Sequence, residues 1–81
     1  MKIGVKILPK NEVLDSQGRA VEGTLNSHGR PVEKCRVGKY VQLDIGESDE
    51  AKALSKAKEI AEFILYNPLI ETFELEVVKR G

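Results

Sequence analysis

Two runs of alternating apolar and polar residues meet in this chain with almost no turn sequence between them. The runs cover residues 32–37 and 41–45, and the stretch that joins them reads Arg36-Val37-Gly38-Lys39-Tyr40. A β-hairpin normally contains a turn of about two to five residues rich in Gly, Asn, Asp or Pro. Here a single glycine must reverse the chain, or else the two runs form one bent strand. A lone glycine in a strand pattern usually marks a bulge or a close backbone approach.

Two further strands are predicted near the ends of the chain. Residues 2–8 alternate between apolar side chains and charged or small ones until Pro9, and residues 70–78 alternate again. Such a period of two is typical of strands with one face buried. The predicted inward face of the four strands consists of odd-numbered residues: Ile3, Val5, Ile7, Cys35, Val37, Val41, Leu43, Ile45, Phe73, Leu75 and Val77.

Two helices are predicted between these strands. The first has Asp15 or Ser16 as its N-cap and ends before Gly29, and the second begins at Ser48. Asn67-Pro68 ends the second helix, because the residue before a proline disfavours helical geometry. Their predicted buried stripes are Ala20, Val21, Thr24, Leu25 and His28 in the first, and Leu54, Ala57, Ile60, Ala61, Ile64 and Leu65 in the second. The order β-α-β-β-α-β predicts an α+β, ferredoxin-like fold, in which two helices cover one face of a four-stranded antiparallel sheet.

The bend and the outer face of the predicted sheet are candidate contact surfaces. Arg36, Lys39 and Tyr40 place two cations and a phenol at the bend, in a chain with only two tyrosines. The outer face mixes charged, aromatic and aliphatic side chains, so it is neither a clean core nor a cleanly solvated surface. Because small domains of this kind often gain stability by oligomerising, we expect the chain to associate with other chains.

The balance of charges argues against nucleic acid as a partner. The chain carries 13 Lys and Arg residues and 13 Asp and Glu residues, whereas nucleic-acid-binding proteins usually have a basic surplus or a basic face. A single cysteine excludes an internal disulfide. No apolar stretch has the length or position of a signal peptide or membrane span. We therefore expect one domain, residues 1–81, in the cytoplasm, with neither a nucleic-acid nor a membrane partner.

No residue pattern predicts a catalytic, cofactor-binding or metal-binding site. His28 has no partners at metal-ligand spacing and is interpreted as a residue that supports a helix end. Cys35 falls on a predicted inward face and is interpreted as a small buried hydrophobe. Glu47, Asp49 and Glu50 suit the positive end of a helix dipole better than a cation site. Neither a Walker A motif nor a dinucleotide-binding glycine motif is present.

Three segments resemble one known family. Residues 15–21, Asp-Ser-Gln-Gly-Arg-Ala-Val, resemble an Asp-Pro-Gln-Gly-x-Ala-Val helix entry, and residues 36–43 resemble an Arg-Val-Gly-Lys-x-Ile-x-Leu strand bend. Residues 65–76 resemble a Leu-x-Asn-Pro-Val-Ile-Glu-x-Tyr-x-Ile-Glu tail. In this order they are similar to PurS, the small subunit of phosphoribosylformylglycinamidine (FGAM) synthase. Ser16, Gly23 and His28 depart from the residues that are frequent in the family.

The resemblance implies a non-catalytic bridging subunit in purine biosynthesis. In that family the complex uses ATP and glutamine to convert formylglycinamide ribonucleotide to its amidine. A large synthetase subunit binds ATP and substrate, a glutaminase subunit releases ammonia, and a small homodimeric subunit joins them and assists ammonia transfer. ATP, magnesium and glutamine would thus be used by the partner subunits, with no cofactor on this chain. The candidate interface residues are Arg36, Gly38, Lys39, Tyr40, Asn67 and Pro68.

An alternative function of a different class is compatible with the same fold. The chain would then be a stand-alone regulatory module that binds a small effector at a dimer interface. In modules of this topology such sites often lie near the loop that follows the first strand. The residues alone leave this alternative open, and the resemblance favours the bridging subunit.

Overall fold

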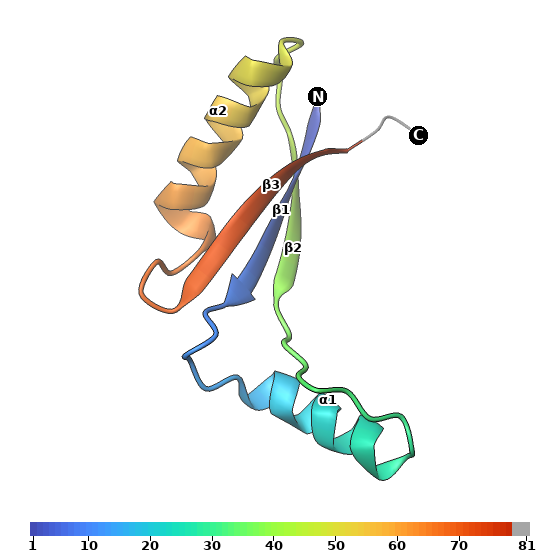
Figure 1. Cartoon of the computed structure of the whole chain (residues 1–81). Coiled ribbons are helices and arrows are strands. Elements are labelled where there is room, and N and C mark those ends of the chain that lie inside the picture. The colour runs from blue at the N-terminus through green and yellow to red at the C-terminus, as the bar shows by residue number, and fades with distance from the viewer. Residues whose placement is uncertain (79–81) are drawn as a thin grey trace.

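The computed structural model describes residues 1–78 and contains three strands and two helices. In chain order they are β1 (Lys2–Pro9), α1 (Ser16–Ser27), β2 (Lys39–Asp44), α2 (Glu50–Ile60) and β3 (Glu71–Val78), as Figure 1 shows. A π-helical turn, η1 (Ala61–Leu65), extends α2. The strands form one antiparallel sheet in the order β2-β1-β3, so that the first strand lies in the middle.

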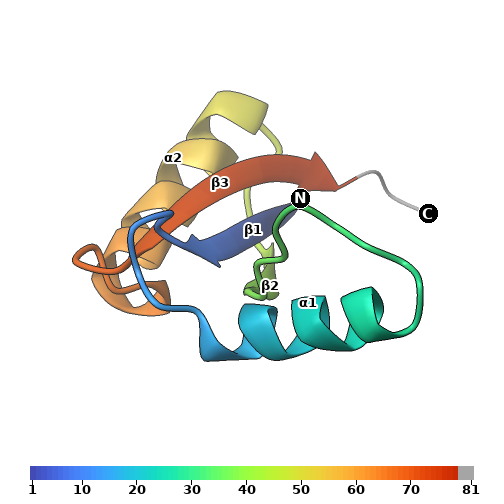
Figure 2. The ribbon, with the colours of Figure 1, turned by 60° about the horizontal axis from the view of Figure 1, so that its bottom comes forward.

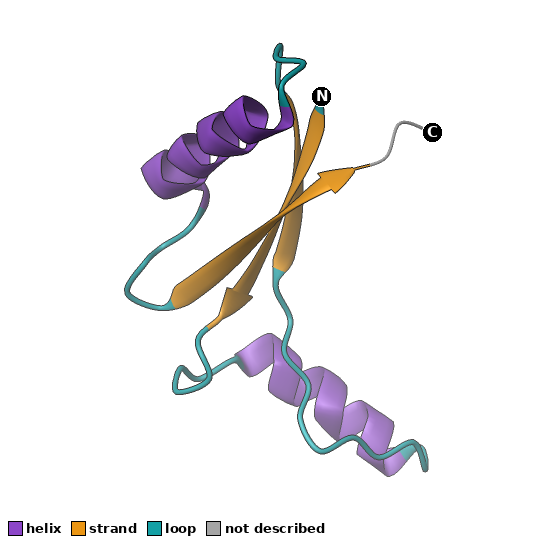
Figure 3. Ribbon diagram, turned by 45° about the horizontal axis from the view of Figure 1, so that its top comes forward, coloured by secondary structure: helices purple, strands orange, loops and turns teal. Residues whose placement is uncertain are grey.

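The core lies between the sheet and α2, which runs along one face of it (Figure 3). Ile3, Val5 and Ile7 of β1 are fully buried, which confirms the predicted inward face of this strand. Ala53 and Ala57 of α2 are also fully buried, and their small side chains let the helix approach the sheet closely. Alternation therefore predicted the inward face of the central strand correctly.

The helix ends follow the predicted chemistry, with one difference. Asp15 is the N-cap of α1, as predicted, and Gly29 follows this helix with a φ of 72°, a conformation that favours glycine. The N-cap of α2 is Asp49, so the prediction of Ser48 was wrong by one residue. The Asp49 carboxylate accepts hydrogen bonds from the N–H groups of Ala51 and Lys52, and a charged acceptor is favourable at this end of the helix dipole.

The π-helical turn η1 rotates the side chains that follow it relative to the apolar stripe of α2. Ala57, Ala61 and Leu65 face the core region as predicted, but the side chain of Ile64 is 69% exposed. A π-helical turn has more residues per turn than an α-helix, so residues beyond it rotate relative to the preceding stripe. The predicted inward position of Ile64 is therefore wrong within the described chain.

The predicted fourth strand is absent from the described residues. Residues 32–37 form an irregular segment with no sheet partner among residues 1–78, although the sequence predicted a strand there. Gly38 alone separates this segment from β2, and one residue is too short for the usual hairpin turn. The prediction of a four-stranded sheet is therefore corrected to three strands for the single chain.

The predicted position of the first helix is also wrong for the single chain. Within residues 1–78, α2 alone packs on the sheet, whereas α1 lies beyond the end of the strands (Figures 1 and 2). Four residues of its predicted buried stripe, Ala20, Val21, Thr24 and His28, are exposed, and Leu25 is only half-buried. The apolar stripe exists in the sequence, but its own chain does not cover it.

The molecule is consequently extended. Its dimensions are 47 × 32 × 14 Å, and its radius of gyration is 15.6 Å, against about 12 Å for a compact domain of this length. Its accessible surface of 6001 Å² exceeds by about 1,100 Å² that of a typical compact monomer of the same mass. No helix among the described residues is long and apolar enough to cross a membrane.

Candidate subunit interface

An arm formed by residues 10–38 carries α1 and the returning segment 32–37 away from the sheet (Figure 2). Asp15 holds the arm together at its base. One carboxylate oxygen accepts a hydrogen bond from the N–H of Gly18, and the other accepts one from the N–H of Val37, each at 2.9 Å. These two bonds stabilise the charged form and lower the pKa of Asp15 below its usual range.

Two further side chains of α1 bind the returning backbone. Glu22 accepts a hydrogen bond of 2.9 Å from the N–H of Cys35, and Asn26 accepts one of 3.3 Å from the N–H of Val32. Gly18 permits this approach, because a Cβ atom there would lie 2.4 Å from the carbonyl oxygen of Cys35. Side chains of α1 thus bind N–H groups that a strand partner would otherwise bind, which explains why the segment stays extended without a sheet.

We expect the arm to loosen in acid because of Asp15. The hydrogen bonds of the folded state lower the pKa of this carboxyl below its value in the unfolded chain. The Asp15 charge therefore contributes fully to the free energy of unfolding above the unfolded-state pKa, and this contribution is lost as the pH falls through the lower folded-state pKa. Urea unfolding at pH 7 should show Asp15→Asn to be less stable than the wild type. The difference should shrink as the pH falls below the ordinary aspartate pKa of about 3.9, because the wild-type carboxyl then begins to lose the charge that the arm stabilises.

Glu12→Gln is the matched control for this experiment. Glu12 lies in the same loop but accepts none of the backbone hydrogen bonds that hold the arm within residues 1–78. A stability difference for Asp15→Asn that stays constant from pH 7 to pH 2 would contradict the assigned role of its charge.

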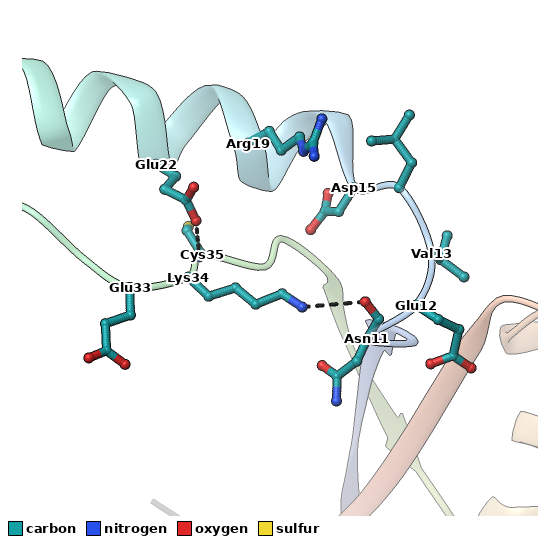
Figure 4. Close-up of a pocket in the computed structure, with 10 residues that line it drawn as sticks. Asn11, Glu12, Val13, Asp15, Arg19, Glu22, Glu33, Lys34 and Cys35 are labelled. Atoms are coloured by element: carbon teal, nitrogen blue, oxygen red, sulfur yellow. Dashed lines mark hydrogen bonds between the residues drawn. The ribbon is translucent and has the colours of Figure 1, made fainter.

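A polar hollow of about 470 Å³ lies where the arm leaves the sheet (Figure 4). Lys34 extends across it and donates a hydrogen bond of 3.3 Å to the carbonyl oxygen of Asn11. Arg36 similarly donates to the carbonyl oxygen of Pro9 at 3.1 Å. The remaining lining includes Glu12, Asp15, Arg19, Glu22, Glu33 and Cys35. Its charges are mixed, and no group of three side chains within residues 1–78 is arranged to hold a metal ion.

Tyr40 lies across the outer face of the sheet and connects its three strands. Its hydroxyl donates a hydrogen bond of 2.7 Å to Glu76 on β3, and Lys6 on β1 forms a 2.8 Å ion pair with the same carboxylate. Gly4 leaves room for the ring, because a Cβ atom there would lie 2.1 Å from the tyrosine hydroxyl. The bonds from Lys6 and Tyr40 lower the pKa of Glu76, whereas the bond to Glu76 raises the pKa of Tyr40.

Gly38 makes the close backbone approach that the sequence indicated. A Cβ atom at this position would lie 2.0 Å from the carbonyl oxygen of Ile7, and Lys39 begins β2 directly opposite Ile7. Lys39 and Tyr40 are exposed, as are Arg36, Asn67 and Pro68. All the candidate interface residues are therefore accessible in the single chain.

Comparison with known proteins identifies the family to which this fold and arm belong. A family model described as "PurS: Phosphoribosylformylglycinamidine (FGAM) synthase" matches residues 2–79. The chain belongs to the PurS family. The PurS subunit of FGAM synthase from Bacillus subtilis is 39% identical over 77 residues, which are 94% of this chain and 90% of that protein.

Solved PurS structures share the arrangement of this chain. The PurS subunit of Thermotoga maritima has a TM-score of 0.86 at 30% identity, covering 93% of this chain and 87% of that one. A chain of the structure named PurLQS from the same organism has a TM-score of 0.83 at 29% identity, with 93% of each chain covered. The resemblance to PurS inferred from the three sequence segments is confirmed.

The turn after η1 is the other candidate contact in this PurS chain. Asn67 accepts a hydrogen bond from the N–H of Leu69 at 3.0 Å, and Glu71 accepts one from the N–H of Asn67 at 2.7 Å. These bonds fix the turn, while Phe63 and Leu69 beside it are 82% and 80% exposed. Sequence analysis missed both apolar residues, although their positions outside the predicted helical stripe and strand face were a usable signal.

Proposed function

We propose that this chain is the small, non-catalytic subunit of FGAM synthase, a ligase of purine biosynthesis, and that it joins the synthetase and glutaminase subunits. Family membership over nearly the whole chain carries this proposal. The similarity to a chain of PurLQS supports a role inside an assembly. Its exposed arm and apolar turn residues suit a protein that acts by contact with other chains.

The chemistry in this proposal belongs to the partner subunits. The synthetase subunit binds ATP, magnesium and formylglycinamide ribonucleotide, and the glutaminase subunit releases ammonia from glutamine. This chain binds no cofactor and assists ammonia transfer by holding the two partners together, in the cytoplasm where nucleotides are made. The candidate contacts are Arg36, Gly38, Lys39, Tyr40, Asn67 and Pro68.

The proposal includes association of this chain with itself. The excess exposed area of about 1,100 Å² per chain is comparable with the ~800 Å² that each partner contributes to a standard interface. In the dimer, residues 32–37 would serve as the fourth strand of a ferredoxin-like sheet. Sedimentation at micromolar concentration should give a dimer or a larger oligomer, and a stable monomer would contradict this part of the proposal.

The test of function is reconstitution with the synthetase and glutaminase subunits. Glutamine-dependent FGAM formation should require this chain, and the three proteins should co-purify. Ammonia at high concentration should partly replace both glutamine and the small subunit, because the synthetase chemistry would be intact. Full glutamine-dependent activity without this chain would overturn the proposed role.

Lys39 and Tyr40 provide a residue-level test of the same assembly. The double substitution Lys39→Ala and Tyr40→Ala should weaken co-purification at least several-fold while the far-ultraviolet circular dichroism stays unchanged. Tyr40→Phe keeps the ring but removes the hydroxyl that bonds to Glu76, so it tests which of the two contributes to assembly. Lys52→Ala on the exposed face of α2 is the control for the loss of a positive charge. Undiminished assembly of the double variant would remove these residues from the interface.

The polar hollow favours one alternative function. It lies beside the loop that follows β1, and Arg19, Lys34 and several carboxylates line it. A small effector with both charges, such as an amino acid, would match this lining. Thermal-shift screening with amino acids and nucleotides tests this alternative, since a specific shift without the partner subunits would favour a regulatory module.

A further inference from the structure

We propose that the open edge of β3 binds an extended segment of a larger FGAM synthase subunit, and that this segment adds to the sheet as a further strand. The segment would carry basic side chains on the outer face of the sheet and apolar side chains on the inner face. This inference rests on the function proposed above, and it assigns one surface of the chain to contact with a different protein.

The strand β3 forms one border of the sheet. Within residues 1–78 it pairs only with β1, over its whole length from Glu71 to Val78 (Figure 1). The opposite border is β2, which residues 32–37 would occupy in the self-association proposed above. The edge of β3 is therefore the one that stays open to a different chain.

Alternate backbone groups of β3 point away from the sheet. The N–H of Lys10 bonds to the carbonyl oxygen of Ile70, and the register of β1 with β3 continues this pairing at every second residue. The even-numbered residues of β3 therefore bond to β1, and the backbone groups of the odd-numbered residues point outward. These are Phe73, Leu75 and Val77, whose N–H groups have no acceptor within residues 1–78. An extended segment can bond to all three, which is the geometry of strand addition.

Negative charge is the only usual protection of an edge strand that β3 carries. The strand contains no proline, and its register with β1 runs without a bulge. Natural proteins shorten, bend, cover or charge such edges, because an open row of N–H and C=O groups binds other strands. In β3 the charges on the outer face are those of Glu74 and Glu76.

These charges disfavour a second copy at this edge and favour a basic partner. If two β3 strands paired about a two-fold axis, any register centred on residues 74–76 would set a glutamate opposite a glutamate. Like charges in directly opposite positions are destabilising, whereas opposite charges are favourable. Glu76 already has Lys6 and Tyr40 as partners, but Glu74 is exposed and forms no ion pair within residues 1–78. A lysine or arginine of the added segment would supply the opposite charge.

Apolar surface lies beside the same edge on the inner face. Phe73 and Leu75 are only half-buried and Val77 is 38% exposed, whereas the apolar residues of the central strand are buried. The turn that leads into β3 adds Leu69 and Ile70, which are 80% and 44% exposed. Apolar side chains of an added strand would lie beside β3 on this face, so the edge selects a segment that alternates apolar and basic residues.

Residue-resolved hydrogen exchange tests this inference on the chain alone and in the reconstituted complex with the synthetase and glutaminase subunits. In the chain alone, the amide protons of Phe73, Leu75 and Val77 should exchange rapidly, because they point to solvent. In the complex they should exchange at least about tenfold more slowly. The amides of Glu74 and Glu76 bond to β1 and should be slow in both states. Exchange with each larger subunit separately identifies the one that supplies the segment.

A charge reversal tests the chemistry of the partner. Glu74→Lys should weaken co-purification with the larger subunits several-fold, whereas Glu59→Lys makes the same change on the exposed face of α2 and should not. Circular dichroism and sedimentation show whether folding and self-association are kept. Because Glu74→Lys sets a second cation opposite Lys6, Glu74→Gln is the milder variant and should weaken co-purification in the same direction. Undiminished co-purification of both Glu74 variants would overturn the basic partner segment.

The exchange experiment separates failure of this inference from failure of the proposed function. Rapid exchange of the odd-numbered amides of β3 in an active complex would overturn the strand addition and leave the bridging function intact. Slow exchange of the same amides in the chain alone would place a second copy at this edge and would also overturn the inference. If no complex forms, or if glutamine-dependent activity does not require this chain, the proposed function fails and the inference fails with it.

Discussion

Replacing Ile7 with alanine is expected to lower the free energy of unfolding by about 2–5 kcal/mol. Ile7 is 1% exposed in the central strand, and it packs in a cluster with Val5 and Ala61. The substitution removes apolar contacts and leaves a cavity that the surrounding strands can fill only partly. A domain of this length has about 4–12 kcal/mol of stability in total, so this single change would remove a large part of it.

Urea unfolding followed by circular dichroism measures this loss. The protein concentration must be held constant, because the stability of a chain that associates depends on it. Lys52→Ala, on the exposed face of α2, should change stability by less than about 0.5 kcal/mol. An Ile7→Ala variant within that same limit would contradict the described core.

The inner face of the central strand was predictable because a strand places alternate residues on opposite sides, whereas Val77 near the end of β3 was predicted to face inward and is 38% exposed. Ile3, Val5 and Ile7 follow this rule and are buried, and Asp15 was predictable because a carboxylate satisfies the free N–H groups at a helix start. Such inferences use residues close together in the sequence. The choice between Ser48 and Asp49 as the second N-cap was not decided by composition alone, since both can accept the same hydrogen bonds.

The position of α1 and of residues 32–37 was not predictable from the same patterns. Alternation says that a segment can pair as a strand, but it does not say which edge it joins or whether that edge belongs to its own chain. The apolar stripe of α1 similarly indicates that one face of the helix packs against another element, but it does not identify that element. In the single chain, Glu22 binds the returning backbone at Cys35, and this contact joins residues too far apart in sequence for a local pattern to reveal.

Only one feature of the sequence indicated the position of the candidate interface, namely a glycine where a hairpin turn was expected. Gly38 stood out because a turn was missing around it, and the structure places its backbone against Ile7. Gly4 gave the same kind of signal inside β1, yet its partner, Tyr40, lies on another strand. A glycine in a strand can indicate that something approaches closely, but only the register identifies the approaching group.

Replacing Gly38 with alanine should therefore lower the free energy of unfolding by about 1–3 kcal/mol, as for an overpacked site. The new Cβ atom would lie 2.0 Å from the carbonyl oxygen of Ile7 and 2.8 Å from a methyl group of Leu8. The first of these neighbours is backbone and cannot rotate away, so β2 would have to move from β1 where Lys39 pairs with Ile7. Urea unfolding at constant protein concentration gives the magnitude.

Gly23→Ala is the matched control, because it makes the same chemical change where space is open. Apart from its chain neighbours and the backbone of its own helix, no atom lies within 4 Å of a Cβ atom at this position in α1, and its φ is not in the left-handed region. This variant should gain about 0.5–1 kcal/mol, since alanine has the higher helix propensity. The two variants should thus change stability in opposite directions. A stabilised Gly38→Ala protein would show that the backbone does not approach Ile7 as described, and that the link between the two runs is free to turn.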